Sequence, residues 1–387
     1  MDKIKNILKQ NRIIYIIYNY VFSFLLKILG IFCPIDDKLV LFNSFGGKKF
    51  DDSPKSIYQY MIQNERYKEY KLCWVLDNPE IVGNLKVEVV KNNSIKFFIT
   101  ALKAKYWITN SSMERGLKFK KKNTVYINTW HGSTLKKLGI DMQNDNCKFR
   151  VSEDYIMYAQ SKLDVEVFSK AFNKYKNDII LCGLPRNDEL CNVQDTEIKK
   201  IREKLNIPHE KKIILYAPTF REYNYDKNGC FIAPPINIEK WKKELSNEFV
   251  LFFRAHYEIN KVLNIKEDDF IYNMTDYNNL NELLKISDII ISDYSSIMID
   301  YSILERPIYA YAYDYDEYSK KRGLYYDLKE VLPNGIQRTE EELIDEIKKC
   351  DYELQKDKTK KFKEMFVEKS GNASKYIDFL IRDTNNK

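Results

Sequence analysis

The sequence contains few residues of the kinds that mark cross-linked, fibrous or linker-dominated proteins. Its 387 residues include 12 Gly and 10 Pro, which excludes collagen-like and linker-dominated chains. No C-x-x-C pair occurs, and an odd number of scattered cysteines fits neither a disulfide framework nor a zinc site. We therefore expect a reducing, cytoplasmic compartment. The cysteines are Cys33, Cys73, Cys147, Cys182, Cys191, Cys230 and Cys350.

Several widespread catalytic motifs are also missing from the sequence. There is no G-x-x-x-x-G-K-[ST] loop, G-x-G-x-x-G fingerprint, H-E-x-x-H or G-x-S-x-G elbow. Their absence disfavours P-loop NTPases, typical dinucleotide enzymes, zincins and typical α/β-hydrolases. Asp314 and Asp316 have the D-x-D spacing of some metal-dependent glycosyltransferases, but a three-residue match arises easily by chance. We expect neither a metal site nor a cofactor.

What the chain does contain indicates folded domains. Hydrophobic residues make up 44% and aromatic residues 14%, which excludes a disordered protein, and the length suits two domains with cores of their own. Short apolar strand-like runs alternate with helical stretches in both halves, as in mostly parallel, helix-covered sheets. We predict one domain over residues 36–205 and a second over 206–387, with 206–212 as a linker.

The first 35 residues predict a membrane-associating helix. Residues 13–32 are almost entirely apolar and follow a basic stretch, with no cleavage site behind them. Asn19, Ser23 and Lys27 recur every fourth residue and form one stripe on a helix, which favours a helix lying in the membrane plane. A helix packed on the protein's own core and a transmembrane span are the alternatives.

The net charge of +7 is concentrated in one stretch. Ten basic residues lie between positions 86 and 122, against only Glu88 and Glu114, so we expect an anionic partner for this surface. A solvated surface without a partner is the alternative. The basic residues are Lys86, Lys91, Lys96, Lys103, Lys105, Arg115, Lys118, Lys120, Lys121 and Lys122.

Two of the three histidines, His131 and His256, follow predicted strands, whereas His209 lies in the linker. At the carboxyl end of a strand in an open α/β sheet, a side chain points toward the ligand crevice. Arg254 lies two residues before His256, so in extended chain both point to one side and suit a diphosphate. Arg186 is a third candidate cation, although a turn residue in a local ion pair is an equal alternative.

Two groups of small residues predict anion sites. Gly132, Ser133 and Thr134 follow His131 directly, and Ser295 and Ser296 follow the apolar strand 289–292. Backbone N–H groups and hydroxyls at such strand-to-helix turns bind phosphate. Ordinary helix caps are the alternative interpretation of the two serines.

The motifs together resemble the CDP-glycerol glycerophosphotransferase family, the teichoic acid primases and polymerases. The resemblance covers about residues 38–330, and its motifs occur in a fixed order. They are FNSFGGKKFDDSPKSIYQYM (42–61), NTWHGSTLKKLGID (128–141), GLPRNDEL (183–190), ILYAPTFRE (214–222), FRAH (253–256), SDYSSIMIDYSILERPIYAY (292–311) and the following YDYDEYSKKRGLYYDL stretch. The family motif usually has Thr-Pro after His-Gly, whereas this chain has Ser133-Thr134, so the local loop geometry is expected to differ.

This resemblance implies a GT-B-like α/β fold, in which two Rossmann-type domains face a central cleft behind an N-terminal amphipathic membrane helix. The first domain would hold the acceptor and the second the CDP-linked donor. His131 and His256 are the expected catalytic residues. The expected donor-binding residues are His131, Gly132, Ser133, Thr134, Leu135, Arg186, Pro218, Thr219, Arg254, Ala255, His256, Ser295, Ser296 and Asp300.

The reaction implied is transfer of glycerol phosphate from CDP-glycerol to a hydroxyl, with release of CMP, in the synthesis of teichoic acid or a related capsular polymer. The acceptor would be an undecaprenyl-diphosphate-linked saccharide or a polyol-phosphate chain. We expect a peripheral protein on the cytoplasmic face of an anionic cell membrane, with no nucleic acid partner. CDP-ribitol transfer, a sugar-nucleotide glycosyltransferase and a non-enzymatic RNA- or membrane-binding protein are the rival interpretations.

Overall fold

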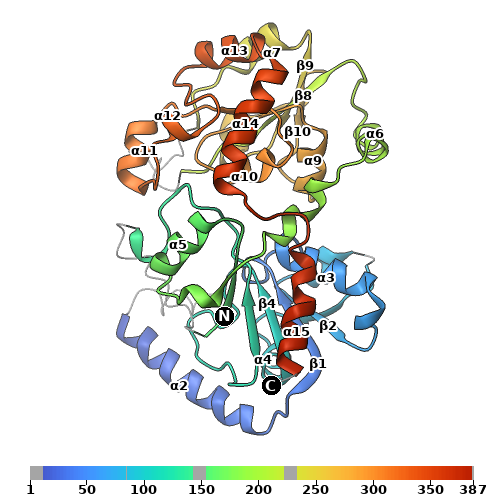
Figure 1. Ribbon diagram of the computed structural model, residues 1–387, viewed down its shortest axis with the longest axis vertical. Helices are drawn as coiled ribbons and strands as arrows, with labels where there is room; N and C mark the ends of the chain where they lie inside the picture. The colour runs from blue at the N-terminus through green and yellow to red at the C-terminus, as the bar shows by residue number, and fades with distance from the viewer. Residues whose placement is uncertain (1–11, 84, 143–153, 222–232, 386–387) are drawn as a thin grey trace.

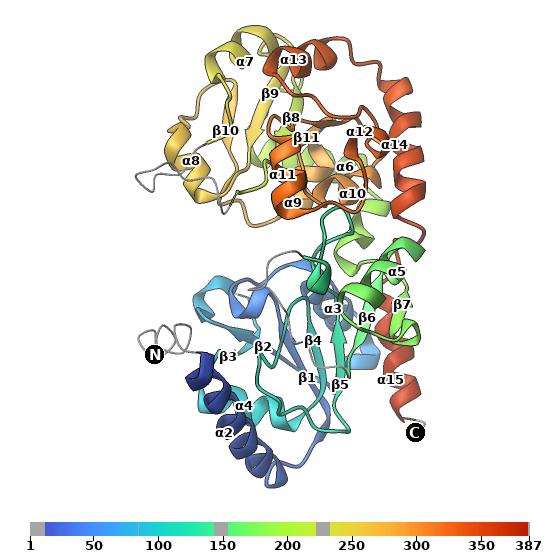
Figure 2. The same cartoon turned by 90° about the vertical axis from the view of Figure 1, so that its left-hand side faces the viewer.

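The computed structural model consists of two stacked α/β lobes (Figures 1 and 2) and describes residues 12–83, 85–142, 154–221 and 233–385. The first lobe has a seven-stranded sheet of order β3-β2-β1-β4-β5-β6-β7, and every strand pair in it is parallel. Its strands are β1 (Asp36–Asn43), β2 (Lys71–Leu76), β3 (Glu88–Lys91), β4 (Ala104–Thr109), β5 (Val125–Asn128), β6 (Ile156–Ala159) and β7 (Ile179–Leu181).

The second lobe has a five-stranded parallel sheet of order β10-β9-β8-β11-β12. Both strand orders start from a central strand and reverse direction there, as in doubly wound nucleotide-binding folds. The strands are β8 (Lys212–Tyr216), β9 (Phe249–Phe253), β10 (Ile271–Asn273), β11 (Ile289–Ser292) and β12 (Ile308–Ala310). The predicted Rossmann-type pair is confirmed.

Helices cover both faces of each sheet (Figures 1 and 2). In the first half they are α2 (Arg12–Ile31), α3 (Asp52–Gln63), α4 (Ile95–Lys103), α5 (Lys162–Ala171) and α6 (Asp195–Lys204). Those that follow are α7 (Ile238–Leu245), α8 (Tyr257–Leu263), α9 (Leu280–Ile286), α10 (Ile297–Ser302), α11 (Tyr315–Arg322), α12 (Leu328–Val331), α13 (Glu340–Lys348), α14 (Tyr352–Phe366) and α15 (Ile377–Asn385).

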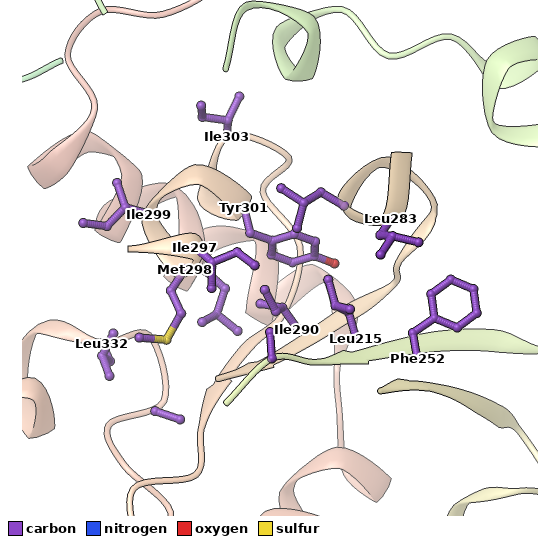
Figure 3. Close-up of a cluster of buried hydrophobic side chains, with 14 of the residues drawn as sticks. Leu215, Phe252, Leu283, Ile290, Ile297, Met298, Ile299, Tyr301, Ile303 and Leu332 are labelled. Carbon is purple, nitrogen blue, oxygen red and sulfur yellow. The ribbon is translucent and has the colours of Figure 1, made fainter. Parts of the chain in front are cut away.

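Each sheet separates two hydrophobic cores because its central strands are apolar on both faces. In β1, Leu39 and Leu41 belong to the core under α4, while Val40 and Phe42 belong to the core under α3. This is the alternation expected of a strand buried on both sides. Figure 3 shows one core of the second lobe, in which Leu215 and Ile290 from neighbouring strands pack against the buried α10.

The last helix packs on the first lobe, although residues 206–387 were expected to form one domain. Ile377, Leu380 and Ile381 of α15 lie in the core of the first sheet beside α3. Asp378 accepts hydrogen bonds there from Tyr60 (2.9 Å) and from Tyr67. The chain therefore crosses between the lobes twice, because α15 covers apolar surface of the first sheet that α3 alone leaves open.

Helix α2 lies along the first lobe and leaves most of its apolar surface exposed. Ser23 accepts a hydrogen bond from Lys118 N (2.9 Å), and Leu26 is buried, whereas Lys27 is exposed. Of the predicted polar stripe, Ser23 therefore faces the protein and Lys27 faces the solvent. Exposed apolar side chains on this helix are Ile13, Ile14, Tyr15, Ile16, Ile17, Tyr20, Val21, Phe22, Phe24, Leu25, Ile28 and Ile31. By length and composition residues 13–31 can also span a membrane.

Candidate active site at the facing ends of the two sheets

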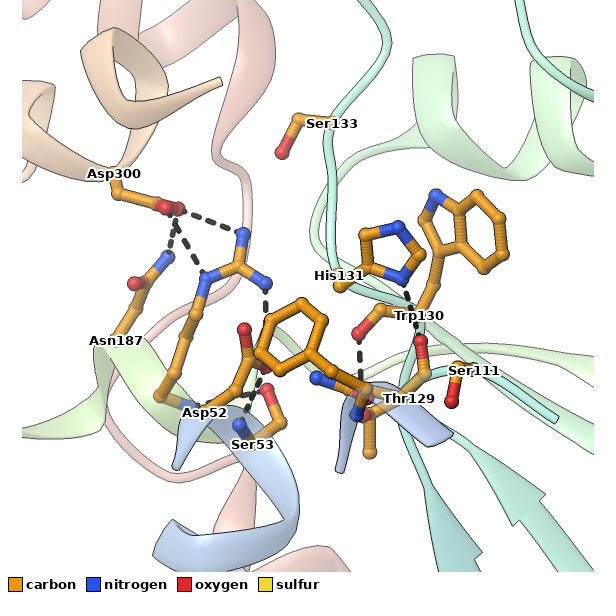
Figure 4. Close-up of polar contacts among 12 residues, drawn as sticks. Asp52, Ser53, Ser111, Thr129, Trp130, His131, Ser133, Asn187 and Asp300 are labelled. Carbon is orange, nitrogen blue, oxygen red and sulfur yellow. Dashed lines mark hydrogen bonds and ion pairs between the residues drawn. The ribbon is translucent and has the colours of Figure 1, made fainter. Parts of the chain in front are cut away.

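His131 lies in the turn after β5, where the backbone fixes the orientation of its ring. Its Nδ1 lies 2.6 Å from the carbonyl oxygen of Asn110, the residue that follows the neighbouring strand β4 (Figure 4). A carbonyl oxygen only accepts hydrogen bonds, so the neutral ring carries its proton on Nδ1 and presents the lone pair of Nε2. The rings of Trp130 and Phe45 flank the imidazole at centroid distances of 4.3 and 5.6 Å.

The surroundings of His131 favour the neutral imidazole. Burial among these neighbours lowers its pKa, against opposing contributions from the Asn110 hydrogen bond and the charge of Asp52. The ring still has an exposed face. A neutral, solvent-accessible imidazole with a free Nε2 is the form that a general base requires near neutral pH.

The residues after His131 connect the first lobe to the second. A Cβ atom on Gly132 would lie 4.0 Å from Ser296 Oγ, so this turn faces the start of α10. Further along, Lys137 N donates to the carbonyl of Gly323 (3.1 Å), and Leu135 is fully buried in a core of the second lobe. The side chain of Leu135 therefore packs in the contact between the lobes, and its expected role in donor binding stays a prediction.

Two expected donor-site residues, Arg186 and Asp300, bind each other. Arg186 Nε and Nη2 donate to the two oxygens of Asp300 at 3.1 and 3.2 Å, and Asp52 lies 3.6 Å from Nη1 (Figure 4). Burial by itself lowers the pKa of the Arg186 guanidinium, but the charges and hydrogen bonds of Asp300 and Asp52 outweigh it and raise this pKa above its ordinary value. Arg186 comes from the 3-10 turn Pro185–Cys191 of the first lobe, so the pair joins the two lobes and its charge is already compensated.

In the second lobe, the expected residues gather at the carboxyl ends of β8, β9 and β11. Thr219 N donates to Asp293 (3.1 Å), and the rings of Phe220 and His256 stack at 4.1 Å. Arg254 Nη1 donates to the carbonyls of Met274 and Tyr277, both at 2.7 Å, and burial lowers the pKa of this guanidinium. Pro218 and Ala255, the chain neighbours of Thr219 and of Arg254 and His256, are buried.

The serine pair stands at the start of α10, which is buried along its length. Ser295 Oγ accepts from Ile297 N at 3.3 Å, while Ser296 occupies the N-cap position without a side-chain cap bond. Both serines are half-buried. The capping alternative therefore applies to Ser295, whereas the Ser296 hydroxyl faces the His131 turn.

The sequence interpretation missed Arg221, which organises this edge of the second sheet. Its guanidinium binds Asp293 (2.5 Å) and both oxygens of Asp314 (2.9 and 3.0 Å), and the rings of Tyr294, Tyr313 and Tyr318 surround it. Arg221 lies within the ILYAPTFRE motif, but the resemblance singled out only Pro218 and Thr219 of that motif. Asp293 lies two residues before the serine pair. By binding Asp293, the buried Arg221 guanidinium therefore fixes the conformation of the loop that leads into α10.

Asp316, the second member of the D-x-D spacing, pairs with Arg338 on the surface at 2.8 Å. Both aspartates of the motif thus have arginine partners. Within the described ranges, no group of three or more His, Cys, Asp or Glu side chains is arranged to hold a metal ion. The expectation that this motif arose by chance is consistent with both pairings.

Asn110 and Asp52, which contact His131 and Arg186, were not predicted from the sequence as site residues. Asn110 follows an apolar strand just as His131 does, so the same strand-end rule could have found it. Asp52 has a left-handed backbone conformation (φ 63°) at the start of α3, and its carboxylate accepts from Ser53 N at 2.6 Å. Such a strained residue in a loop–helix junction is visible only in the structure.

Comparisons with known proteins agree with this geometry. Residues 25–382 match the family described as CDP-Glycerol:Poly(glycerophosphate) glycerophosphotransferase. The chain is 34% identical to a teichoic acid poly(glycerol phosphate) polymerase of Bacillus spizizenii, an alignment that covers 98% of this chain and 100% of the relative.

Among solved structures, the wall teichoic acid polymerase TagF superposes with a TM-score of 0.85 at 33% identity and covers 96% of both chains. A histidine-to-asparagine variant of TagF soaked with CDPG superposes with a TM-score of 0.82 at 34% identity, over 91% of this chain and 90% of that one. These matches confirm the resemblance drawn from the motifs and the GT-B-like fold. The chain belongs to the CDP-glycerol:poly(glycerophosphate) glycerophosphotransferase family.

Proposed function

We propose that the chain transfers glycerol phosphate from CDP-glycerol to a hydroxyl group of a membrane-lipid-linked saccharide or a growing polyol-phosphate chain. Membership of the family supports the donor and the reaction class. The observation that carries the mechanism is the Nδ1 contact of His131 with Asn110, which leaves the lone pair of Nε2 to accept a proton, in a turn whose Gly132 lies next to Ser296 at the start of α10.

The acceptor oxygen attacks the β-phosphorus of CDP-glycerol in line, and the phosphoanhydride bond to the α-phosphate breaks as CMP leaves. His131 Nε2 takes the proton of the attacking hydroxyl, which is general-base catalysis worth about 10²- to 10⁴-fold in rate. The proposed donor contacts are Thr219, His256, Ser295 and Ser296, whose hydroxyl, imidazole and backbone N–H groups suit diphosphate oxygens. Arg186, paired with two carboxylates, serves instead to hold the lobes together.

The donor is tested by measuring CMP release from CDP-glycerol and, in parallel, from CDP-ribitol, with and without a lipid-linked saccharide acceptor. Acceptor-dependent release from CDP-glycerol, with a product heavier by one or more glycerol phosphates, is the expected result. One addition identifies a primase, and a ladder of additions a polymerase. CMP release from CDP-ribitol alone would make CDP-ribitol the donor. If neither CDP-polyol yields CMP and a UDP- or GDP-sugar releases its own nucleotide, the enzyme is instead a sugar-nucleotide glycosyltransferase.

Peripheral attachment to an anionic membrane at the cytoplasmic face is the second part of the proposal. A groove of about 330 Å³ runs beside the exposed face of α2, and its lining contains four lysines and no acidic residue. Gly30, Ile31, Leu102 and Phe119 form its apolar part, and the lysines are Lys27, Lys120, Lys121 and Lys122. Apolar burial combined with attraction to anionic headgroups is how in-plane helices bind membranes.

Changing Lys27, Lys121 and Lys122 to Glu should reduce sedimentation with anionic liposomes, because each lysine near the surface contributes about 1 kcal/mol. The matched control variant carries Glu at Lys240, Lys242 and Lys348, which lie on α7 and α13 of the second lobe. This variant should sediment like the wild type. Equal sedimentation of both triple variants and the wild type would contradict membrane attachment through this groove.

A further inference from the structure

Gln160 is a fully buried polar residue at the point where β6 ends, next to the His131 turn. Its side-chain Nε2 donates to Ser133 Oγ at 2.6 Å, and its Oε1 accepts from Asn187 Nδ2 at 3.5 Å. Ser133 lies two residues after His131. A single amide group thus contacts both the turn that carries the proposed base and the turn that carries Arg186.

These contacts continue into the second lobe. Asn187 Nδ2 also donates to Asp300 Oδ1 at 2.7 Å, and Asp300 lies on α10, the helix that starts with the serine pair. The backbone carbonyl of Gln160 accepts from Glu368 N (2.8 Å) and Lys369 N (3.0 Å) in the segment that leads from α14 to α15. Gln160 therefore touches both places where the chain passes between the lobes.

We propose that Gln160 is a positioning residue, which holds the His131 turn in register with the donor-binding start of α10. The inference rests on the proposed transfer reaction and identifies the group that aligns its two halves. The base comes from one lobe and the serine pair from the other, so a shift of one lobe by about 1 Å would separate them. Displacements of that size reduce turnover by about 10²-fold without removing any reacting group.

The chemistry of the position explains why an amide suits it. Glutamine donates through nitrogen and accepts through oxygen at the same time, as the contacts with Ser133 and Asn187 require. Methionine fills a similar volume but makes neither bond. Glutamate would add a buried negative charge close to Asp300 and to Asp164, whose carboxylate accepts a hydrogen bond from Gln160 N at 3.3 Å.

The test compares wild-type enzyme with Gln160→Met, with the milder Gln160→Asn, and with Gln355→Met as the matched control. Gln355 is also a buried glutamine with both amide atoms bonded, to Asn334 at 2.6 and 3.0 Å, but it lies on α14, on the outer side of the second lobe. The readouts are kcat and KM for acceptor-dependent CMP release, the Kd for CDP-glycerol, and Tm.

Both Gln160 variants should lower kcat by about 10- to 100-fold and change the Kd for CDP-glycerol by less than about threefold. Gln355→Met should lower Tm about as much as Gln160→Met does, and it should leave kcat unchanged. Ser133→Ala removes one of the two contacts that Gln160→Met removes, so the Ser133→Ala/Gln160→Met double variant should lose no more kcat than Gln160→Met alone.

Retention of kcat within about threefold in either folded Gln160 variant would overturn the proposal. So would losses that simply multiply in the double variant, or an equal loss of kcat in Gln355→Met. If wild-type enzyme releases no CMP from CDP-glycerol, the proposed function fails, and that outcome is separate from any behaviour of the variants.

Discussion

Replacing Arg221 with methionine should strongly destabilise the second lobe. The Arg221 guanidinium is about 1% exposed, and Asp293 and Asp314, its two partners, are 2% and 10% exposed. Arg221→Met leaves both carboxylates buried without their cation. Breaking a buried ion pair in this way costs about 3–5 kcal/mol, and two stranded acids place the expected loss at the upper end.

For a lobe of this size, each kcal/mol corresponds to about 2–4 °C, so Tm should fall by about 10 °C or more. Arg338→Met is the matched control, because Arg338 also binds both oxygens of one carboxylate, that of Asp316, two residues from Asp314. The side chains of Arg338 and Asp316 are 42% and 72% exposed, so this ion pair should contribute nothing measurable to Tm. Circular dichroism melting of both variants checks the difference.

A loss of under about 1 kcal/mol in Arg221→Met would refute the reasoning, as would equal destabilisation by the two variants. A third variant sharpens the test. Adding Asp293→Asn and Asp314→Asn to Arg221→Met removes the stranded charges and should recover part of the lost stability, since the penalty arises from buried unpaired carboxylates. No recovery would mean that lost packing against the tyrosines, and not charge, causes the effect.

Three further outcomes follow from the structure. Burial raises the pKa of Asp164 from 3.8 to about 7, so the folded state keeps a proton that the unfolded chain releases and stability falls as pH rises through this window. The free energy of unfolding of Asp164→Asn, measured against that of the wild type in urea, should therefore be larger at pH 8 than at pH 4 by up to about 4 kcal/mol. A difference between variant and wild type that does not change with pH would contradict this. Burial lowers the pKa of His131 below its ordinary 6.5, so kcat/KM should fall on the acid side with a midpoint below pH 6.5; a midpoint above 7 would exclude His131 as the base. Gly139→Ala should lower Tm by several degrees, because a Cβ there would lie 2.0 Å from the carbonyl of Ala171 at a φ of +49°, and an unchanged Tm would show that the turn relaxes.

The positions of the main site residues could be predicted from sequence because one rule governs them. In a parallel sheet, all strands end at the same edge, so residues that follow apolar strands meet there. His131, His256 and the serine pair satisfied this rule, and the structure places each of them at such an edge. The same rule applied more widely would have included Asn110 and Gln160.

Contacts between distant segments could not be predicted in this way. Arg186 and Asp300 were both selected as ligand-binding residues, but they are separated by 114 positions and the sequence does not reveal that they bind each other. The burial of Leu135 in the second lobe and the return of α15 to the first depend on how complete surfaces fit together. Local periodicity records which face of an element is apolar, but not which partner covers it.

The central claim is that a base in the first lobe acts on a donor held by the second. The most direct measurement compares wild-type enzyme and His131→Ala for CDP-glycerol binding by calorimetry and for acceptor-dependent CMP release. The account predicts that binding stays within a few fold while release falls by about 10²- to 10⁴-fold. Release within about tenfold of wild type, with binding intact, would contradict it and place the base elsewhere.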